Sequence, residues 1–217
     1  MKIGIISDTH GLLRPEVRKA LQGCSAVLHG GDIDRRSVLE ELTQAAPVYA
    51  VRGNADRDWA LDLPVLLDME LFGMRVCMAH KKKDLPEDTS SYDLVVYGHS
   101  HKYETGLRGK TLFVNPGSCG PRRFHQAITM AVLTLEGGKM EVTKIDIPHA
   151  PGKAADLSGR DLKRDIERIV KEIEKGRTVE ETVSRLQLDR DFTDRIFRLY
   201  LTHPGVTSDQ IMTKLGL

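Results

Sequence analysis

Apolar runs and amphipathic segments alternate along the first third of the chain. Runs of apolar residues at 3–6, 26–28 and 48–51 predict buried strands. Between them, the segments 15–22 and 37–45 carry apolar residues at helical spacing and predict two helices. Polar residues and glycines follow each predicted strand, so each strand is expected to lead its polar side chains into a turn.

Strand follows strand in the middle of the chain. The predicted strands are 65–71, 74–79, 94–97, 112–114, 127–135 and 140–147. The first two flank Gly73 and the last two flank Gly137 and Gly138, so each of these pairs predicts a hairpin. Early strand–helix alternation followed by consecutive strands predicts an α/β sandwich with helices on its outer faces, rather than a purely parallel sheet.

The last quarter of the chain has a different pattern. The stretch 148–152 is rich in proline and glycine and is typical of a linker. Beyond it, apolar residues recur at helical spacing, and Thr178 and Thr207 each begin a sequence typical of a capping box. The expected boundaries are 1–148 for a main domain, 149–155 for the linker and 156–217 for a small all-helical extension.

Composition narrows the classes of protein that fit this pattern. The chain has 217 residues, and its net charge of +1 lacks the strong basic field of non-specific nucleic-acid binders. Cys24, Cys77 and Cys119 form no CxxC pair and fit reduced thiols. No window approaches the roughly 20 apolar residues of a membrane span. We therefore expect a cytoplasmic protein without membrane contact.

Polar and ionisable side chains gather at or just after the carboxyl ends of the apolar runs. The set is Asp8, His10, Asp32, Asn54, His80, His99 and His101. Open sheets bind their ligands at these strand ends. So many polar groups at one edge would repel one another or stay unsatisfied unless cations lay between them. Two divalent metal ions would divide the set into two shells with one shared ligand.

The spacing of these residues supports such a pair of metal ions. Asp8 and His10, like His99 and His101, are alternate residues that can reach one cluster. Asp32 lies between these pairs in the sequence and follows a glycine turn, so its carboxylate is the natural bridge. A metal pair about 3.5–4 Å apart generates a bridging hydroxide near neutral pH and neutralises charge on the attacking and leaving oxygens. Phosphoester hydrolysis needs both effects.

The ordered motifs of residues 1–148 resemble those of a known family. They are Asp8-Thr9-His10-Gly11, Gly31-Asp32, Gly53-Asn54-Ala55-Asp56, Ala79-His80 and Gly98-His99-Ser100-His101. This series resembles the calcineurin-like metallophosphoesterases, especially their small bacterial and archaeal phosphodiesterase branch. The resemblance implies a four-layer α/β/β/α sandwich and a metal-dependent phosphodiesterase.

The resemblance also implies how the ligands divide. One ion would be held by Asp8, His10, Asp32 and His101, and the other by Asp32, Asn54, His80 and His99. Asn54 is expected to contact the substrate as well. Imidazole and carboxylate ligands suit Mn²⁺, which we expect first, and also Fe²⁺, Ni²⁺, Co²⁺ and Zn²⁺.

Two positions depart from the family pattern. Many relatives carry a histidine that protonates the leaving group where this chain has Ala55. Asp56 is the nearest titratable residue, either as a general acid or as a group that orients ligands. Where the small phosphodiesterases often show His-Gly-His, Lys82 is either a phosphate contact or part of a solvated run of lysines. Without the histidine, diesters with good leaving groups, cyclic or aryl, are the expected substrates.

A later turn also resembles the phosphodiesterase branch. The turn 115–118 and the arginines after Pro121 would suit a phosphate oxygen, so Ser118, Arg122 and Arg123 are candidate substrate-binding residues. The alternative is a structural turn with exposed arginines. Four histidines lie outside the motifs and are not expected to bind metal: His29, His125, His149 and His203.

A second class of function fits the same sequence. In it, the sandwich is a catalytically weak scaffold or regulatory protein, and the helical tail binds a protein or a nucleic acid. The segment 178–201 loosely resembles a helix-turn-helix. Asp189, Asp191 and Asp194 lie on it and would face phosphates, so nucleic-acid binding is not favoured. A helical cap, a docking arm or a homo-oligomer contact fits the tail better.

Overall fold

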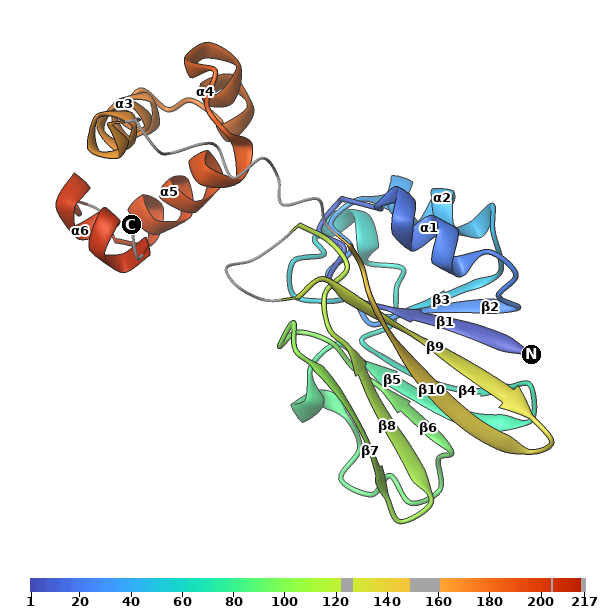
Figure 1. The fold of residues 1–217 in the computed structure, drawn as a ribbon. Helices are drawn as coiled ribbons and strands as arrows, with labels where there is room; N and C mark the ends of the chain where they lie inside the picture. Colours follow the sequence, from blue (N-terminus) through green and yellow to red (C-terminus); the bar gives the residue numbers. More distant parts are fainter. Residues whose placement is uncertain (122–126, 149–160, 204, 216–217) are drawn as a thin grey trace. The chain divides into compact units, whose positions relative to one another are not determined.

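The computed structural model describes residues 1–121, 127–148, 161–203 and 205–215. The chain divides into two compact units, Met1–His149 and Ala150–Leu217 (Figure 1). Within the described residues, no helix has the length and hydrophobicity needed to cross a lipid bilayer.

The first unit contains a five-stranded mixed sheet. Its strand order is β10 (Lys139–Asp146), β9 (Thr129–Glu136), β1 (Lys2–Ile6), β2 (Ala26–His29) and β3 (Val48–Ala50). The central three strands β1, β2 and β3 are parallel, and β9 runs antiparallel to β1. The crossovers between the parallel strands contain α1 (Pro15–Leu21) and α2 (Arg36–Thr43). The carboxyl ends of β1, β2 and β3 therefore lie at one edge.

A second five-stranded sheet faces the first. Its order is β4 (Leu66–Leu71), β5 (Met74–Ala79), β6 (Leu94–Val96), β8 (Thr111–Pro116) and β7 (Tyr103–Arg108). Here β5, β6 and β8 are parallel, and the edge strands β4 and β7 are antiparallel to their neighbours. The two predicted hairpins, β4–β5 and β9–β10, are confirmed.

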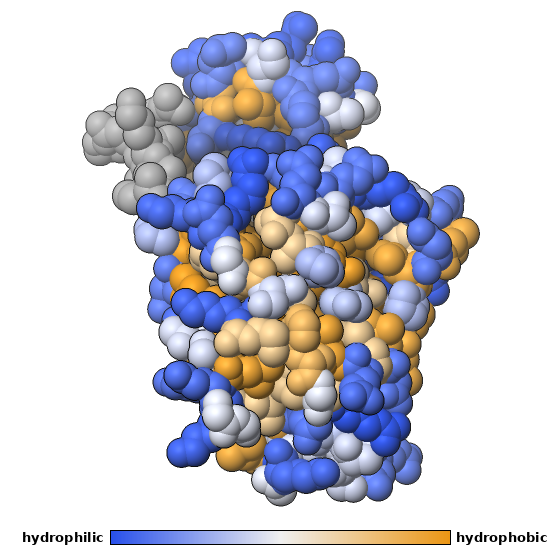
Figure 2. Space-filling view, turned by 90° about the vertical axis from the view of Figure 1, so that its right-hand side faces the viewer, coloured by the Kyte–Doolittle hydropathy of each residue, from blue (hydrophilic) through white to orange (hydrophobic). Residues whose placement is uncertain are grey.

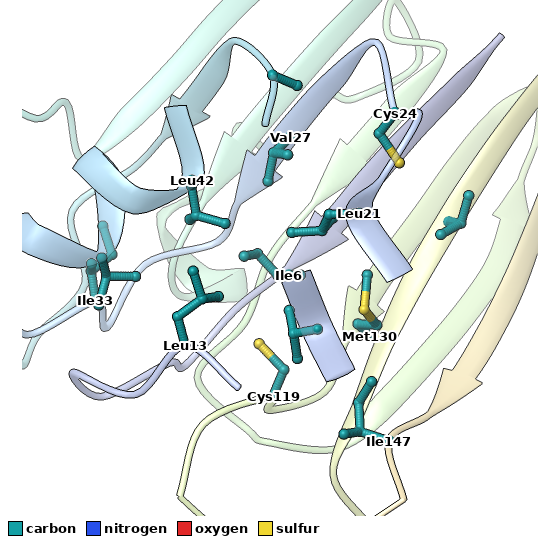
Figure 3. Close-up of a cluster of buried hydrophobic side chains, with 14 of the residues drawn as sticks. Ile6, Leu13, Leu21, Cys24, Val27, Ile33, Leu42, Cys119, Met130 and Ile147 are labelled. Carbon is teal, nitrogen blue, oxygen red and sulfur yellow. The ribbon is translucent and has the colours of Figure 1, made fainter. Parts of the chain in front are cut away.

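Alternate residues of the strands build three apolar layers. Ile5, Leu28 and Val96 belong to the buried apolar layer between the sheets. Ile6 and Val27 point the other way, into the layer beneath the helices that also holds Leu13, Leu21 and Leu42 (Figure 3). This alternation is the strand period of two, so each sheet has both faces covered.

The outer face of the second sheet is covered thinly. Cys77, Val95 and Phe113 form a small cluster there with Tyr92 and Tyr97. Within the described residues, the segment over this face contains a short 3₁₀ helix, η2 (Lys82–Asp84), where the first sheet has two α-helices. A second 3₁₀ helix, η1 (Asp58–Ala60), follows β3. The predicted α/β sandwich with C-terminal helices is confirmed.

The second unit is helical and has its own apolar cluster. It contains α3 (Leu162–Glu174), α4 (Val179–Leu186), α5 (Arg190–Thr202) and α6 (Ser208–Leu215). Ile166, Ile169, Phe192 and Ile196 are buried where these helices meet. Both predicted capping boxes are confirmed, because the side chains and amides of Thr178 and Glu181, and of Thr207 and Gln210, bond reciprocally.

One face of the first unit is apolar over a broad area. Figure 2 views the side on which the N-terminus lies in Figure 1, and hydrophobic residues gather there within a polar border. Met1 itself is 47% exposed. Contiguous exposed apolar surface of this kind is typical of an interaction face.

Candidate metal centre

The parallel strands of both sheets deliver their following residues to one place. Hydrogen bonds join loops that are far apart in the sequence: the amide of Asp8 donates to Gly31 O at 2.9 Å, and the amide of Gly98 to His80 O at 3.0 Å. The amide of His99 donates to Asp8 Oδ2 at 3.2 Å, which links the loops after β6 and β1. The loops that follow the strands are therefore joined into one continuous surface on which the candidate ligands lie.

Six of the seven predicted ligands form two groups of three. Asp8, His10 and His101 present ligand atoms that lie within 4.8 Å of one another, and Asp32, His80 and His99 do the same. The His10 and His101 ring centroids are 5.4 Å apart, and those of His80 and His99 are 5.1 Å apart.

Asp32 lies between the two groups. Its Oδ2 is 3.4 Å from His80 Nε2 and 3.9 Å from His10 Nε2, so one oxygen faces a histidine of each group. Asn54, the seventh predicted residue, is exposed, and its amide nitrogen is 3.5 Å from the same oxygen. This is the arrangement expected of a carboxylate shared between two cations.

Buried ligand atoms at this place have no hydrogen-bond partner among the described residues. They include Asp8 Oδ1 and His80 Nε2, and Asp8 Oδ1 is 3.1 Å from His101 Nε2. Leaving buried polar atoms unpaired costs about 1–3 kcal/mol each, and a cation between them would satisfy them. The residues present therefore fit a divalent metal pair, with oxygen and imidazole donors from both sheets.

Hydrogen bonds fix the candidate ligands from behind. Ser7 Oγ donates to Asp8 Oδ2 at 2.6 Å, which leaves Oδ1 toward the group. His80 Nδ1 donates to Gly30 O at 2.8 Å, so the lone pair of the neutral ring is on Nε2. His10 Nδ1 is 3.2 Å from Asp34 Oδ2, which orients that ring in the same way.

The backbone at five of the candidate ligands is left-handed. The φ angles are +55° at Asp8, +44° at His10, +54° at Asp32, +69° at His99 and +57° at His101. This conformation costs roughly 1–2 kcal/mol per residue and persists where the surroundings impose it. The backbone hydrogen bonds between the strand-end loops impose it here, and His10 N donating to Asp32 O at 3.0 Å is one of them.

A glycine allows the loops to approach so closely. A β-carbon at position 98 would collide with the Ser7 hydroxyl and lie 2.8 Å from Asp8 Oδ2. Only glycine therefore fits between Ser7 and the loop that carries His99 and His101.

Neighbouring histidines and hydrogen bonds favour the ionised form of the carboxylates in the two groups. Burial raises the pKa of Asp32, but the neighbouring His80 imidazole and the hydrogen bond from the Ala55 amide outweigh burial and lower that pKa to about 2. Burial likewise acts against the charged form of Asp8, yet His101 and Ser7 bring its pKa below the usual value. Both carboxylates are therefore ionised at neutral pH and ready to bind cations.

The pKa values of His80 and His99 are shifted in opposite directions. Burial lowers the pKa of His80, but Asp32 and then Asp8 raise it above its usual value. Burial, followed by the charges of His80 and Lys81, lowers the pKa of His99. His99 is thus the more readily deprotonated ligand of the second group.

The carboxylate of Asp56 accepts hydrogen bonds from backbone amides of the loops that carry the candidate ligands. Its Oδ1 accepts from the amides of Ile33 at 2.8 Å and Asp34 at 2.7 Å, and its Oδ2 accepts from the amide of Gly53 at 2.8 Å. The side chain is 7% exposed. Of the two roles considered for Asp56, these bonds favour orientation of the ligand loops over proton donation.

The other predicted substrate contacts either have partners within the protein or lie outside the described residues. Lys82 Nζ is 3.1 Å from Glu104 Oε1, so that ammonium is paired with an acid on β7. Ser118 is buried, and its hydroxyl donates to Asp8 O at 2.9 Å, where it braces the loop from behind. Arg122 and Arg123 lie outside the described residues.

The histidines that were not expected to bind metal lie outside both groups, as far as the structure describes them. His29 is fully buried, with its ring bonded to Thr9 Oγ1 at 3.0 Å and to the Gly31 amide at 3.2 Å. His203 is on the exposed end of α5. His125 and His149 are outside the described residues.

Three positioning residues were not predicted from the sequence. Ser7 and Asp34 hold Asp8 and His10, and Asn115 Nδ2 donates to Gly98 O at 2.9 Å and Ser100 Oγ at 3.0 Å. Ser7 directly precedes a motif residue, and Asp34 follows Asp32 at the same spacing as His10 follows Asp8. Those adjacencies are the signals that could have identified Ser7 and Asp34.

Comparisons with known proteins show which family the chain resembles. A model of the calcineurin-like phosphoesterase superfamily domain matches residues 1–138. A probable metallophosphoesterase of Methanothermobacter thermautotrophicus is 32% identical over 155 residues, which are 65% of this chain and 90% of the relative. A phosphodiesterase of Methanocaldococcus jannaschii is 29% identical over 141 residues, 55% of this chain and 84% of the relative. The solved structure of an archaeal phosphodiesterase matches with a TM-score of 0.54 and 27% identity, covering 67% of this chain and 99% of its own.

Proposed function

Because the chain belongs to the calcineurin-like phosphoesterase superfamily, we propose that it is a phosphodiesterase that uses two divalent metal ions. The observation that carries the proposal is the pair of three-residue groups with Asp32 between them, in which buried ligand atoms have no hydrogen-bond partner within the described part of the chain. A shared carboxylate is typical of catalytic metal pairs, whereas structural sites close their shells with protein ligands.

The proposal assigns the ligands to two shells. One ion is held by Asp8, His10, Asp32 and His101, and the other by Asp32, Asn54, His80 and His99. Mn²⁺ is the metal proposed first, and Fe²⁺, Ni²⁺, Co²⁺ and Zn²⁺ also suit imidazole and carboxylate donors. When bound, two such ions supply a hydroxide nucleophile near neutral pH and offset the charge that develops on phosphoryl oxygens.

The protein side chains prepare the site for this chemistry. Ser7 and the His99 amide hold one oxygen of Asp8, and the Ala55 amide donates to Asp32 Oδ1 at 2.8 Å, so both carboxylates are oriented in advance. The alanine at position 55 has no proton to donate to a leaving group, and the carboxylate of Asp56 already accepts hydrogen bonds from backbone amides. The proposed substrates are therefore diesters with good leaving groups, such as cyclic or aryl esters.

A cytoplasmic location is part of the proposal. Cys24, Cys77 and Cys119 are all free thiols and all buried. Buried free cysteines are typical of proteins kept in a reducing compartment.

Turnover of bis(p-nitrophenyl) phosphate with added Mn²⁺ tests the proposed activity. We expect Asp32→Asn and His99→Ala to lose at least about a hundredfold in kcat/KM while keeping the wild-type circular dichroism spectrum, since each loses a ligand. His203→Ala is the matched control, because that histidine is exposed on the helical unit. Unchanged turnover in the two site variants would refute the assignment.

The apolar face in Figure 2 favours a second candidate function, a scaffold that binds a protein partner. Nucleic acid is the less suitable partner, because Arg190 and Arg198 of the helical unit are paired with Glu180 and Asp194. Sedimentation of the purified chain tests the homo-oligomer form of this candidate. A protein that binds Mn²⁺ but hydrolyses no diester would favour the scaffold over the enzyme.

A further inference from the structure

Two runs of cations follow candidate metal ligands, Arg35-Arg36 and Lys81-Lys82-Lys83, and in each run one side chain has an acidic partner. Arg36 donates to Asp62 Oδ1 at 2.9 Å and to Trp59 O at 2.8 Å. Lys82 pairs with Glu104 and lies 5.0 Å from the ring centroid of Tyr97. Within the described part of the chain, the neighbouring side chains of Arg35 and Lys81 have neither an ion pair nor a hydrogen bond.

Arg35 lies beside the first group of ligands. Its Nε and Cδ are 3.1 and 3.2 Å from where a β-carbon of Gly11 would be, so its stem packs on the residue that follows His10. Gly11 N donates to Ile33 O at 2.8 Å, which keeps the two loops together. The only acid adjacent to Arg35 in sequence is Asp34, whose Oδ2 faces His10.

Lys81 lies beside the second group. It directly follows His80, whose carbonyl accepts the amide of Gly98 at 3.0 Å, so the chain at Lys81 runs next to His99. Lys81 is half-buried and His99 is exposed. After burial and His80, the charge of Lys81 is the next contribution that lowers the pKa of His99, which agrees with their proximity.

Stability does not explain why an arginine is at position 35. Arg35 is the N-cap residue of α2, its side chain makes no capping hydrogen bond, and the first turn of α2 contains no acidic residue. Serine, threonine, asparagine and aspartate are the stabilising caps, and a cation at the amino end of a helix opposes the helix dipole. A residue that breaks a local rule in this way is typical of a functional position.

We propose that Arg35 and Lys81 bind anionic oxygens of the substrate outside the metal pair, so that the site prefers a phosphodiester carrying a further phosphate. The inference rests on the proposed function and gives its substrate class. The metal groups would neutralise the scissile phosphate, so cations beside them are placed for a neighbouring anionic group. Guanidinium and ammonium groups form charge-assisted hydrogen bonds with phosphate oxygens.

Calorimetric titration of the full chain in Mn²⁺ tests the proposal with thymidine 3′,5′-bisphosphate and thymidine 5′-monophosphate. We expect the wild type to bind the bisphosphate about tenfold more tightly, and Arg35→Gln and Lys81→Gln each to lose most of that preference. Arg36→Gln and Lys82→Gln are the adjacent controls and should keep it. Arg35→Ser should lose the preference and raise Tm, because serine caps α2.

Equal affinity of the wild type for the two nucleotides would overturn the inference, and so would an equal loss in all four glutamine variants. A parallel assay uses the p-nitrophenyl ester of thymidine 5′-phosphate with and without a 3′-phosphate. Turnover of both esters with the same KM overturns the substrate preference and leaves the phosphodiesterase intact. Preferential bisphosphate binding without turnover of either ester supports the cation pair and contradicts the phosphodiesterase.

Discussion

At the scale of single residues, Ser7 decides which oxygen of Asp8 faces the proposed metal centre. We expect Ser7→Ala to weaken Mn²⁺ binding by about 10–100-fold, as is usual when a partner of a metal ligand is lost. It should also lower the free energy of unfolding of the metal-free protein by about 1 kcal/mol, since the 2.6 Å hydrogen bond to Asp8 is buried. Calorimetric titration and urea melts measure the two effects.

Ser37→Ala is the matched control for Ser7, because it removes an exposed hydroxyl from α2. It should change neither Mn²⁺ affinity nor the unfolding free energy measurably. Wild-type Mn²⁺ affinity in Ser7→Ala would contradict the positioning role.

His29 should make the metal-free protein less stable in mild acid. Burial lowers the pKa of His29 to about 4, while an unfolded histidine has a pKa of about 6.5. As pH falls from 6.5 to 4, the unfolded state gains a proton that the folded state does not, so the free energy of unfolding falls by about 3 kcal/mol. Above pH 6.5 this contribution is complete.

Urea melts in chelator at pH 7 and pH 4.5 measure this contribution of His29. In His29→Gln the difference between the two pH values should shrink by about 2 kcal/mol, since glutamine does not titrate. Asp32 does not interfere, because its pKa of about 2 places its loss of stabilisation below pH 4. The exposed His203→Gln serves for comparison, and an equal effect in both variants would contradict the assignment.

At this scale, the sequence predicted the candidate ligands that the structure brings together, but not the residues that orient them. Strand ends and residue types identify Asp8 or His99 because a carboxylate or imidazole after a buried strand is chemically unusual. Asp34 and Asn115 act through partners that the fold brings near, at a separation of 24 residues between His10 and Asp34. Such contacts depend on loop conformation, which residue type alone does not specify.

At the scale of elements, the β4–β5 hairpin contains a strained turn. Leu71 pairs with Met74, and the two turn residues, Phe72 and Gly73, have φ angles of +53° and +78°. A turn with two left-handed residues prefers Asn-Gly. Since Phe72 is 46% exposed, Phe72→Asn should raise the free energy of unfolding by about 1 kcal/mol.

Urea denaturation of the Phe72 variant checks this, with Gly73→Ala as the opposite change. Alanine at φ +78° should destabilise the hairpin by about 1 kcal/mol. A loss of stability in Phe72→Asn would mean that ring packing outweighs backbone strain.

Hydrophobic patterning missed one strand, β7. β7 (Tyr103–Arg108) is an edge strand that pairs only with β8, and nearly all of its side chains are exposed. It therefore lacks the alternation that burial of one face imposes, and Gly106 lies within it. β9 and β10 were predicted because Gly137 and Gly138 mark their turn.

At the scale of the whole molecule, we expect residues 1–148 to fold and to hydrolyse the diester without the helices. The two units have separate apolar clusters, and every candidate metal ligand belongs to the first unit. Turnover of the fragment 1–148 should match that of the full chain, and residues 156–217 should melt cooperatively on their own.

The control truncation ends at residue 136 and removes β10, which pairs with β9 along eight residues. It should lose stability, because an entire edge strand is missing. Loss of turnover in the fragment 1–148 would instead make the helical unit part of the catalytic protein.

The left-handed backbone at the candidate ligands also limits how this site can change over generations. At positions such as Asp8 and His99, only glycine, asparagine, aspartate and histidine adopt the left-handed conformation at low cost, whereas valine or isoleucine would distort the loop. A lineage that abandons catalysis can therefore exchange aspartate for asparagine or glycine and keep its architecture. Descendants that have lost the activity would then carry small polar residues at these positions, while the fold stays the same.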